Sequence, residues 1–308
     1  MTGGGPSAGR AAAPVPLRAR LAAGERLVGT FSLVPAVEII EIVAVAGFDF
    51  VICDMEHGPY DLGSLRHALL AARARSLPVV VRVRDADPAA IGAVLDLGCD
   101  GVLVPQVASA EEARAVVAAA RFTPEGERGA HPFVRAADYG ADRDYFARAG
   151  RATAVMLMIE GLGGIAAAPR IARLPGVDAL FLGPVDLSHA MGLPGRPDHP
   201  RVVAELERVA RDAADAGTAT AVFTASPEAV PVWWGRGVPV VACGVDTELV
   251  RAAFARAVAT ARGGDTVGGG ARGGATGRLD AAAHAEGAGT ADAAGPPAPP
   301  AIRTPSRG

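Results

Sequence analysis

The sequence contains no lysine, and its positively charged side chains are all arginines. A Schiff-base aldolase needs a lysine amine, and pyridoxal phosphate enzymes hold their cofactor through one, so both classes of enzyme are excluded. The P-loop of nucleotide-binding proteins also requires a lysine, which excludes that motif. Any carbonyl chemistry of this chain must proceed without a lysine imine.

Cysteine is scarce, and its positions indicate buried thiols. Cys53, Cys99 and Cys243 each lie in or beside an apolar segment, without the CxxC or Cys/His spacing of zinc sites. This pattern is typical of a reducing compartment rather than of a disulfide framework. Residues 1–16 lack the apolar core of a signal peptide, so we expect the cytoplasm.

Long apolar runs and a strong charge imbalance are also missing. No run approaches the roughly 18 apolar residues of a transmembrane helix, so no membrane span is expected. The net charge of -3 and the isoelectric point near 6.1 give no electrostatic basis for binding nucleic acid. We therefore expect a globular protein with small-molecule partners.

Half of the residues are hydrophobic, and they form short runs that alternate with amphipathic segments. The predicted strands are 27–33, 48–53, 78–83, 101–104, 152–159, 179–182, 218–223 and 238–243. The predicted helices include a short one from Leu17 and those at 62–74, 88–97, 109–121, 200–216 and 246–262. Such a series of eight units over about 240 residues predicts a (β/α)8 TIM barrel. A doubly wound open sheet is the alternative, although no GxGxxG follows the first strand.

Composition divides the chain into three regions. Residues 17–262 are the predicted barrel, and residues 1–16 and 263–308 are Gly/Ala/Pro-rich segments predicted to be disordered. Within the barrel, residues 122–151 form a long stretch predicted to be irregular. Loops of this length inside a domain are usually functional or disordered.

Polar residues follow the predicted strands at their C-terminal ends, where the active site of a barrel lies. They are Asp54, Glu56 and His57 after the second strand, Arg82 after the third, Gln106 after the fourth, Glu160 after the fifth and Asp186 after the sixth. Burying such groups without partners is costly, so their convergence indicates function. Structural alternatives remain, since Arg82 could simply pair with Asp54, and Asp186 could cap a helix.

The chemistry of these side chains suits a metal-assisted reaction. Glu160 and Asp186 would hold Mg²⁺ or Mn²⁺ and leave coordination positions for water and substrate. Such a metal could polarise a 2-oxo acid and stabilise its enolate. Arg82 could hold a carboxylate or an oxyanion, and His57 is a candidate acid/base that a neighbouring carboxylate would orient.

Other polar residues are secondary candidates. Asp96 ends a predicted helix and could cap it or reach a neighbouring subunit. His189 and His199 follow the sixth strand and could contact substrate. Arg128 and His131, in the irregular stretch, could belong to a lid or a subunit contact.

Several motifs together resemble one family. They are Asp54-x-Glu56-His57, Val80-Val81-Arg82, Gly101-Val102-Leu103-Val104-Pro105, Gly126-x-Arg128-Gly129, Ile159-Glu160, Gly183-Pro184-x-Asp186-Leu187-Ser188 and Gly244-Val245-Asp246. In order and spacing, these motifs resemble the HpcH/HpaI family of metal-dependent, class II 2-oxo acid aldolases. The resemblance covers about residues 21–262.

The resemblance implies a reaction and roles for its residues. It implies reversible cleavage of a 4-hydroxy-2-oxo acid to pyruvate and an aldehyde, through an enolate bound to Mg²⁺, Mn²⁺ or Co²⁺. Glu160 and Asp186 would hold the metal, and Arg82 would stabilise the enolate. His57, paired with Asp54, would be the acid/base at the aldol hydroxyl. The absence of lysine agrees, because such chemistry without a Schiff base requires a metal.

The resemblance also implies an assembly and a substrate pocket. The last helix of the barrel would be exchanged between subunits of a hexamer, and Asp96 would reach a neighbouring site. Gln106, Gly183 and Pro184 would line the substrate pocket.

The sequence departs from the family pattern close to the expected metal site. Met158 stands where glutamine is frequent, Gly161 where threonine is frequent, and 131–133 are not the expected small residues. These changes leave open an alternative in which the same enolate site serves a condensing synthase or an oxaloacetate decarboxylase of secondary metabolism. A non-catalytic barrel that serves as a binding subunit is a further alternative.

Overall fold

The predicted strands form a closed barrel of eight parallel strands, paired in chain order, with the last strand returning to the first. The structure is a computed structural model that describes residues 15–263. The strands are β1 (Leu27–Ser32), β2 (Phe50–Asp54), β3 (Val79–Arg82), β4 (Gly101–Val104), β5 (Ala154–Ile159), β6 (Ala179–Leu182), β7 (Ala219–Thr224) and β8 (Val240–Val245). The (β/α)8 prediction is confirmed, and the open sheet is excluded.

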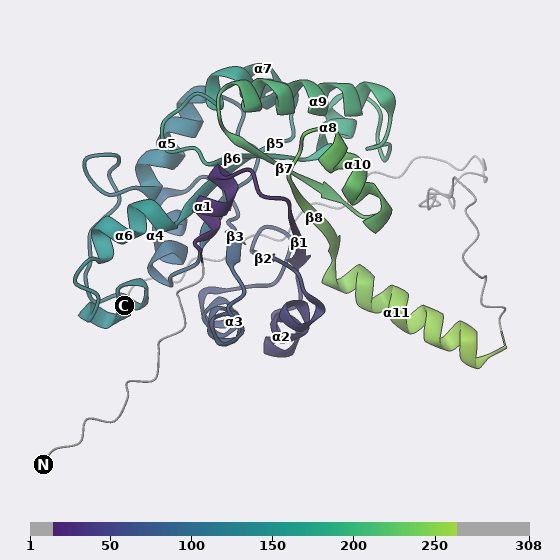
Figure 1. Cartoon of the computed structure of the whole chain (residues 1–308), viewed down its shortest axis with the longest axis horizontal. Helices are drawn as coiled ribbons and strands as arrows, with labels where there is room; N and C mark the ends of the chain where they lie inside the picture. Colours follow the sequence, from purple (N-terminus) through teal and green to yellow (C-terminus); the bar gives the residue numbers. More distant parts are fainter. Residues whose placement is uncertain (1–14, 264–308) are drawn as a thin grey trace, which may run out of the picture. The chain divides into compact units, whose positions relative to one another are not determined.

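Helices surround this barrel (Figure 1). They are α1 (Leu17–Ala22), α2 (Val37–Ala46), α3 (Leu62–Ala74), α4 (Pro88–Asp96), α5 (Ala110–Ala120), α6 (Tyr145–Ala152), α7 (Leu162–Ile171), α8 (Pro184–Ala190), α9 (Pro200–Asp215), α10 (Val230–Gly235) and α11 (Asp246–Ala261). Local chemistry sets several of their starts. The Asp87 carboxylate accepts from the Ala89 N–H at 3.1 Å, and the Ser109 hydroxyl accepts from the Glu112 N–H at 3.1 Å.

The hydrophobic residues form two main clusters because each strand is covered on both faces. One cluster fills the barrel interior and includes Phe31, Ile52, Leu103 and Phe181. The other lies between the strands and the outer helices. Leu17 belongs to the interior cluster, so α1 packs against that cluster at the N-terminal end of the barrel.

The stretch 122–151, predicted to be irregular, is only partly so. It contains a 3-10 helix, η1 (Arg135–Gly140), and α6. Tyr145 and Ala149 of α6 are buried in a small cluster with Ala137 of η1. The prediction was wrong here because α6 is short and its stability depends on this tertiary packing.

The last helix, α11, is nearly all exposed. Asp246 is its one buried residue, and the Asp246 carboxylate accepts hydrogen bonds from the backbone N–H groups of Leu33 and Val34 and from the Ser32 hydroxyl, at 2.9–3.0 Å. This carboxylate ties the start of α11 to the end of β1. From there α11 extends away from the barrel (Figure 1).

Three further findings bear on the predictions from composition. Cys53, Cys99 and Cys243 are buried free thiols, as predicted. No helix within residues 15–263 is long and apolar enough to cross a membrane. The predicted disorder falls mainly on residues 1–14 and 264–308, which lie outside the described part of the chain.

Candidate active site

The polar strand ends meet at the C-terminal end of the barrel. Asp54 is the last residue of β2 and lies in register with Arg82, the last residue of β3. Asp54 was expected in the loop after the strand, but this pairing makes it part of the strand. The guanidinium of Arg82 binds the fully buried Asp54 carboxylate with both ends, through Nε to Oδ1 at 2.8 Å and Nη2 to Oδ2 at 2.6 Å. Such a bidentate pair fixes the plane of the guanidinium.

The remaining nitrogen of Arg82, Nη1, faces the interior of the site. It lies 3.1 Å from Glu56 Oε2 and 3.9 Å from the Met158 sulfur, while the guanidinium stacks 4.9 Å from the centre of the Phe31 ring. Burial lowers the pKa of Arg82, but the hydrogen bond and charge of Asp54, with other nearby carboxylates, raise it overall. Arg82 is therefore a fixed positive charge at the base of the site.

Glu160 directly follows β5 and is only 7% exposed. Its Oε1 accepts a hydrogen bond from the Gln106 backbone N–H at 2.9 Å, while its Oε2 has no partner among residues 15–263. Burial, followed by the nearby charges of Asp186 and Glu56, raises the pKa of Glu160 to about 7, although Gln106 and Arg82 oppose the shift. The site thus holds more negative charge than its own arginine compensates.

Asp186 and Glu160 are brought together by the turn after β6. Asp186 lies in the first turn of α8 and is exposed, so its carboxylate is accessible from solvent. Gly183 caps α8, and Pro184 begins it. A Cβ added to Gly183 would lie 2.6 Å from Glu160 Cβ and 2.8 Å from its Oε2, so only glycine leaves Glu160 its place.

These residues fit a divalent cation. No group of three or more His, Cys, Asp or Glu ligands occurs within residues 15–263, so the two carboxylates would be completed by substrate and water. The unpartnered Oε2 of Glu160 and the excess negative charge around it favour a bound cation. Oxygen donors of this kind suit Mg²⁺ and Mn²⁺.

His57 lies at the rim of the site, and its surroundings differ from the predicted ones. Asp54 Oδ1 accepts from the backbone N–H groups of Glu56 and His57, at 3.0 and 3.3 Å, rather than from the imidazole. The imidazole side chain is 65% exposed, and its Nε2 lies 3.9 Å from Glu56 Oε2. Because Arg82 already uses both oxygens of Asp54, Glu56 is the carboxylate that faces the imidazole.

Glu56 contacts three other residues of the site, which its position in the sequence did not indicate. Besides Arg82 and His57, it accepts a hydrogen bond from Gln106 Nε2 at 3.3 Å. The backbone of Gln106 has a positive φ of 57°, and in this conformation its N–H reaches Glu160 and its amide reaches Glu56. Phe31 was also missed as a member of the site, although its place near the C-terminal end of β1 could have indicated it.

The secondary candidates lie elsewhere. Asp96, the last residue of α4, pairs with Arg128 at 2.6 Å. His199 caps α9, where its Nδ1 accepts from the Arg201 N–H at 3.2 Å. His131 and His189 are exposed. Within the described part of this single chain, none of these five residues forms a hydrogen bond or an ion pair with Glu160 or Arg82.

Comparison with known proteins agrees with this geometry. Residues 27–253 match the model of the HpcH/HpaI aldolase/citrate lyase family. A hydroxypyruvate/pyruvate aldolase of Cupriavidus necator is 34% identical over 248 residues, which are 80% of this chain and 92% of that protein. Among solved structures, an HpcH/HpaI aldolase/citrate lyase family protein of Burkholderia cenocepacia superposes with a TM-score of 0.77 at 32% identity, covering 80% of this chain and 98% of that one. A citrate synthase superposes with a TM-score of 0.74 at 28% identity, over 81% and 98%.

Proposed function

The chain belongs to the HpcH/HpaI aldolase/citrate lyase family, and we propose that it reversibly cleaves a 4-hydroxy-2-oxo acid to pyruvate and an aldehyde. By homology it is a class II pyruvate aldolase, a carbon–carbon lyase. The observation that carries the specific proposal is the buried Glu160, whose free Oε2 shares the strand-end face with Arg82. Together they offer a cation site and a fixed positive charge.

Glu160 and Asp186 are the residues that would hold the metal, with Mg²⁺, Mn²⁺ and Co²⁺ as candidates. A bound divalent cation supplies Lewis-acid polarisation of a 2-oxo group. Arg82, immobilised by Asp54, binds the oxyanion end of the substrate and favours the charge that develops as the methyl carbon of pyruvate loses a proton. Gln106 and Gly183 lie against Glu160, and Pro184 follows Gly183 at the start of α8, so we expect these three residues to contact the substrate.

His57 is the proposed acid/base. Its exposed imidazole can exchange protons with solvent and with the hydroxyl of the aldol substrate, and Glu56 stabilises the protonated ring. In cleavage, His57 accepts the hydroxyl proton as the carbon–carbon bond breaks and the aldehyde leaves, and that proton then passes to the methylene carbon of the enolate to give pyruvate. In condensation, His57 takes a methyl proton of pyruvate and delivers it to the new alkoxide.

A second use of the same site has a specific observation in its favour. The sulfur of Met158, at a position where glutamine is frequent in the family, lies 3.9 Å from Arg82 Nη1, and the superposed citrate synthase performs a condensation by its name. The alternative is therefore a condensing synthase or an oxaloacetate decarboxylase. Oxaloacetate turnover without an aldehyde acceptor would favour it, and a strict need for an aldehyde would count against it.

The proposed assembly is a hexamer in which α11 is exchanged between subunits. Leu249, Val250, Phe254 and Val258 form an exposed apolar stripe on α11, with Phe254 69% exposed. On α2 of the same barrel, Ile42 and Val45 are exposed as well. These two surfaces offer complementary apolar area for a partner subunit. In such an assembly Asp96 would approach a neighbouring site.

The proposed compartment is the cytoplasm, whose reducing conditions suit the three free thiols.

The test is proton–deuterium exchange at the methyl group of pyruvate, followed by NMR with and without EDTA. Wild type should exchange only with metal present. E160Q should lose the exchange, while the matched control E111Q, at an exposed helix start, should keep it. Exchange that persists in E160Q, or wild type that never exchanges with metal supplied, would contradict the proposal. A screen of aldehydes then identifies the acceptor.

A further inference from the structure

A cavity of about 770 Å³ lies at the end of the barrel opposite the active site. Its lining includes Val79 at the start of β3, Asp100 just before β4 and Thr153 just before β5. Those positions are the N-terminal ends of three strands, whereas Arg82 and Glu160 lie at C-terminal ends. The cavity is therefore separate from the aldolase site, and its size is typical of small-molecule pockets.

Four arginines line this cavity: Arg73, Arg128, Arg135 and Arg148. Three of them have carboxylate partners, namely Asp138 at 3.3 Å from Arg73, Asp96 at 2.6 Å from Arg128, and Asp142, which pairs with Arg148.

Arg135 differs from the other three. Among residues 15–263 no carboxylate pairs with it, and its Nη1 donates to the Leu97 carbonyl. Burial and the neighbouring guanidinium of Arg73 lower the pKa of Arg135. A partly buried positive charge without a counter-ion is unfavourable, so this position favours an anion.

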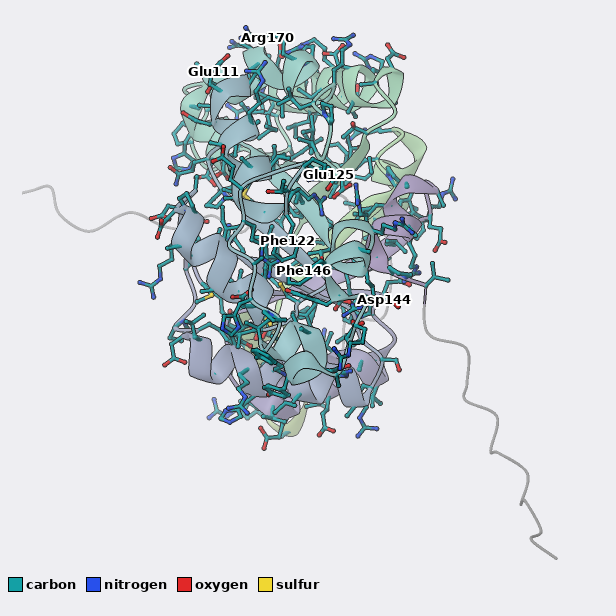
Figure 2. The ribbon with its side chains drawn as sticks, turned by 90° about the vertical axis from the view of Figure 1, so that its left-hand side faces the viewer. Glu111, Phe122, Glu125, Asp144, Phe146 and Arg170 are labelled. Carbon is teal, nitrogen blue, oxygen red and sulfur yellow. The ribbon has the colours of Figure 1, made fainter. Side chains whose placement is uncertain are left out.

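Arg128 gives a second, independent indication. Its side chain is 4% exposed, and its Nε is buried without a hydrogen-bond partner among the residues that the structure describes. Nη2 contacts Asp96 and the Tyr145 hydroxyl, and the guanidinium stacks 4.6 Å from the Phe122 ring centre. Figure 2 shows Phe122 and Phe146 close together on this side of the molecule, and their rings are 5.0 Å apart. Aromatic packing thus holds Arg128 rigid at the cavity wall.

The acidic residues of the lining do not cancel this charge. Asp138 and Asp142 are each engaged by an arginine. Asp100 accepts a hydrogen bond from the Val79 N–H at 2.9 Å, and burial raises its pKa, which favours its neutral form. The rest of the lining includes apolar side chains such as Leu69, Leu77, Leu95 and Ala149.

We propose that this cavity binds a small organic anion, whose carboxylate or phosphate group contacts Arg135 and whose carbon skeleton packs against the apolar lining. The four arginines supply the donors that planar or tetrahedral oxyanions need. The apolar lining favours a metabolite with a carbon body over a bare inorganic ion. Within one chain this cavity shares no residue with the catalytic end, and its only link to the proposed assembly is Arg128, which pairs with Asp96.

The experiment is calorimetric titration of the full, metal-free chain with two probes, citrate for carboxylates and glycerol 3-phosphate for phosphates. We expect at least one to bind, and R135Q to weaken that binding at least tenfold. The doubly substituted R73Q/R148Q chain should also weaken it, and since both side chains are more than half exposed it should still fold. The matched control R170Q should bind as wild type does, because Arg170 lies at the far end of this side of the molecule (Figure 2).

The outcomes separate the cavity from the catalytic end. If R82Q abolishes binding while R135Q and R73Q/R148Q leave it intact, the anion occupies the active site, and the proposal is overturned. Absence of binding by both probes at millimolar concentration overturns it too. The relative affinities for citrate and glycerol 3-phosphate show whether the natural anion carries carboxylate or phosphate.

Discussion

Replacing Gly183 by alanine tests most directly the geometry of Glu160, the carboxylate proposed to hold the metal. The backbone at Gly183 has φ -100°, which alanine adopts without strain, so the substitution acts only through the steric contacts of its added Cβ. The added Cβ would lie 2.6 Å from Glu160 Cβ, where ordinary contact begins at 3.4 Å. Glu160 Cβ is attached to the backbone and cannot swing aside as the end of a long side chain can. The Glu160 carboxylate must therefore shift by roughly 0.8 Å.

Such a shift is small for folding and large for catalysis. Overpacking of this kind costs about 1–3 kcal/mol of unfolding free energy. A displacement near 1 Å at a catalytic group costs up to about 100-fold in rate. We expect G183A to fold, to bind Mn²⁺ at least tenfold more weakly and to exchange the pyruvate methyl protons about 10- to 100-fold more slowly.

Gly161 provides the matched control. It also neighbours Glu160, but a Cβ added there would have no atom within 4 Å, and its φ of -123° suits any residue. G161A should keep metal affinity and exchange near wild type. Titration of Mn²⁺ by electron paramagnetic resonance and NMR exchange measure both quantities. If G183A matches wild type in both, or if G161A is equally impaired, the assignment of Glu160 as a metal ligand held in place by Gly183 is refuted.

Four further changes test the buried ion pair, the pH dependence of metal binding, the acid/base and the apolar face of α11. D54N removes the buried negative charge that pairs with Arg82 and places an NH2 donor against one end of the guanidinium, so it should lower the unfolding free energy by about 3–5 kcal/mol in urea titrations, and an unchanged midpoint would contradict the pairing. Burial is the main reason why the pKa of Glu160 is raised to about 7, so below pH 7 a metal ion must displace a proton from this carboxyl. The affinity for Mn²⁺ should therefore fall about tenfold per pH unit below pH 7 and level off above it. An affinity that does not change with pH would contradict the assignment of Glu160 as a metal ligand. H57N should slow aldol cleavage about 100- to 10,000-fold without shifting the unfolding midpoint, because the imidazole is exposed; a large loss of stability would show a structural role instead. F254D should dissociate the proposed hexamer in sedimentation experiments, while the matched change H67D on exposed α3 should not.

Local chemistry explains why much of the fold was predictable. The buried strands appear as short apolar runs because parallel strands are covered on both faces, as β4 and β6 illustrate with their predicted bounds unchanged. The helices predicted at 88–97 and 109–121 begin close to their predicted starts because the side-chain oxygens of Asp87 and Ser109 each satisfy a free N–H there. The bounds of α3 were also predicted as the structure has them.

For the site, the sequence predicted which strand ends meet but not most of the contacts between their side chains. The pairing of Arg82 with Asp54 follows from neighbouring positions on β2 and β3, and it was foreseen as an alternative. The position of Glu56 could not be foreseen, because it depends on the loop backbone after β2. The positive φ of Gln106 was equally hidden, since neither glycine nor asparagine marks that turn. Both features arise from tertiary contacts that no local pattern encodes.

Because α11 is anchored to the barrel at its first residue, Asp246, a small rotation there moves the whole helix. Its 16 residues give an arm of about 24 Å, so a tilt of 10° at the base would move the far end by about 4 Å. A disturbance too slight to affect the strands near Asp246 would thus be magnified at the apolar stripe. Substitutions at Ser32 or Asp246 should therefore weaken the proposed association between subunits more than they lower the stability of the barrel.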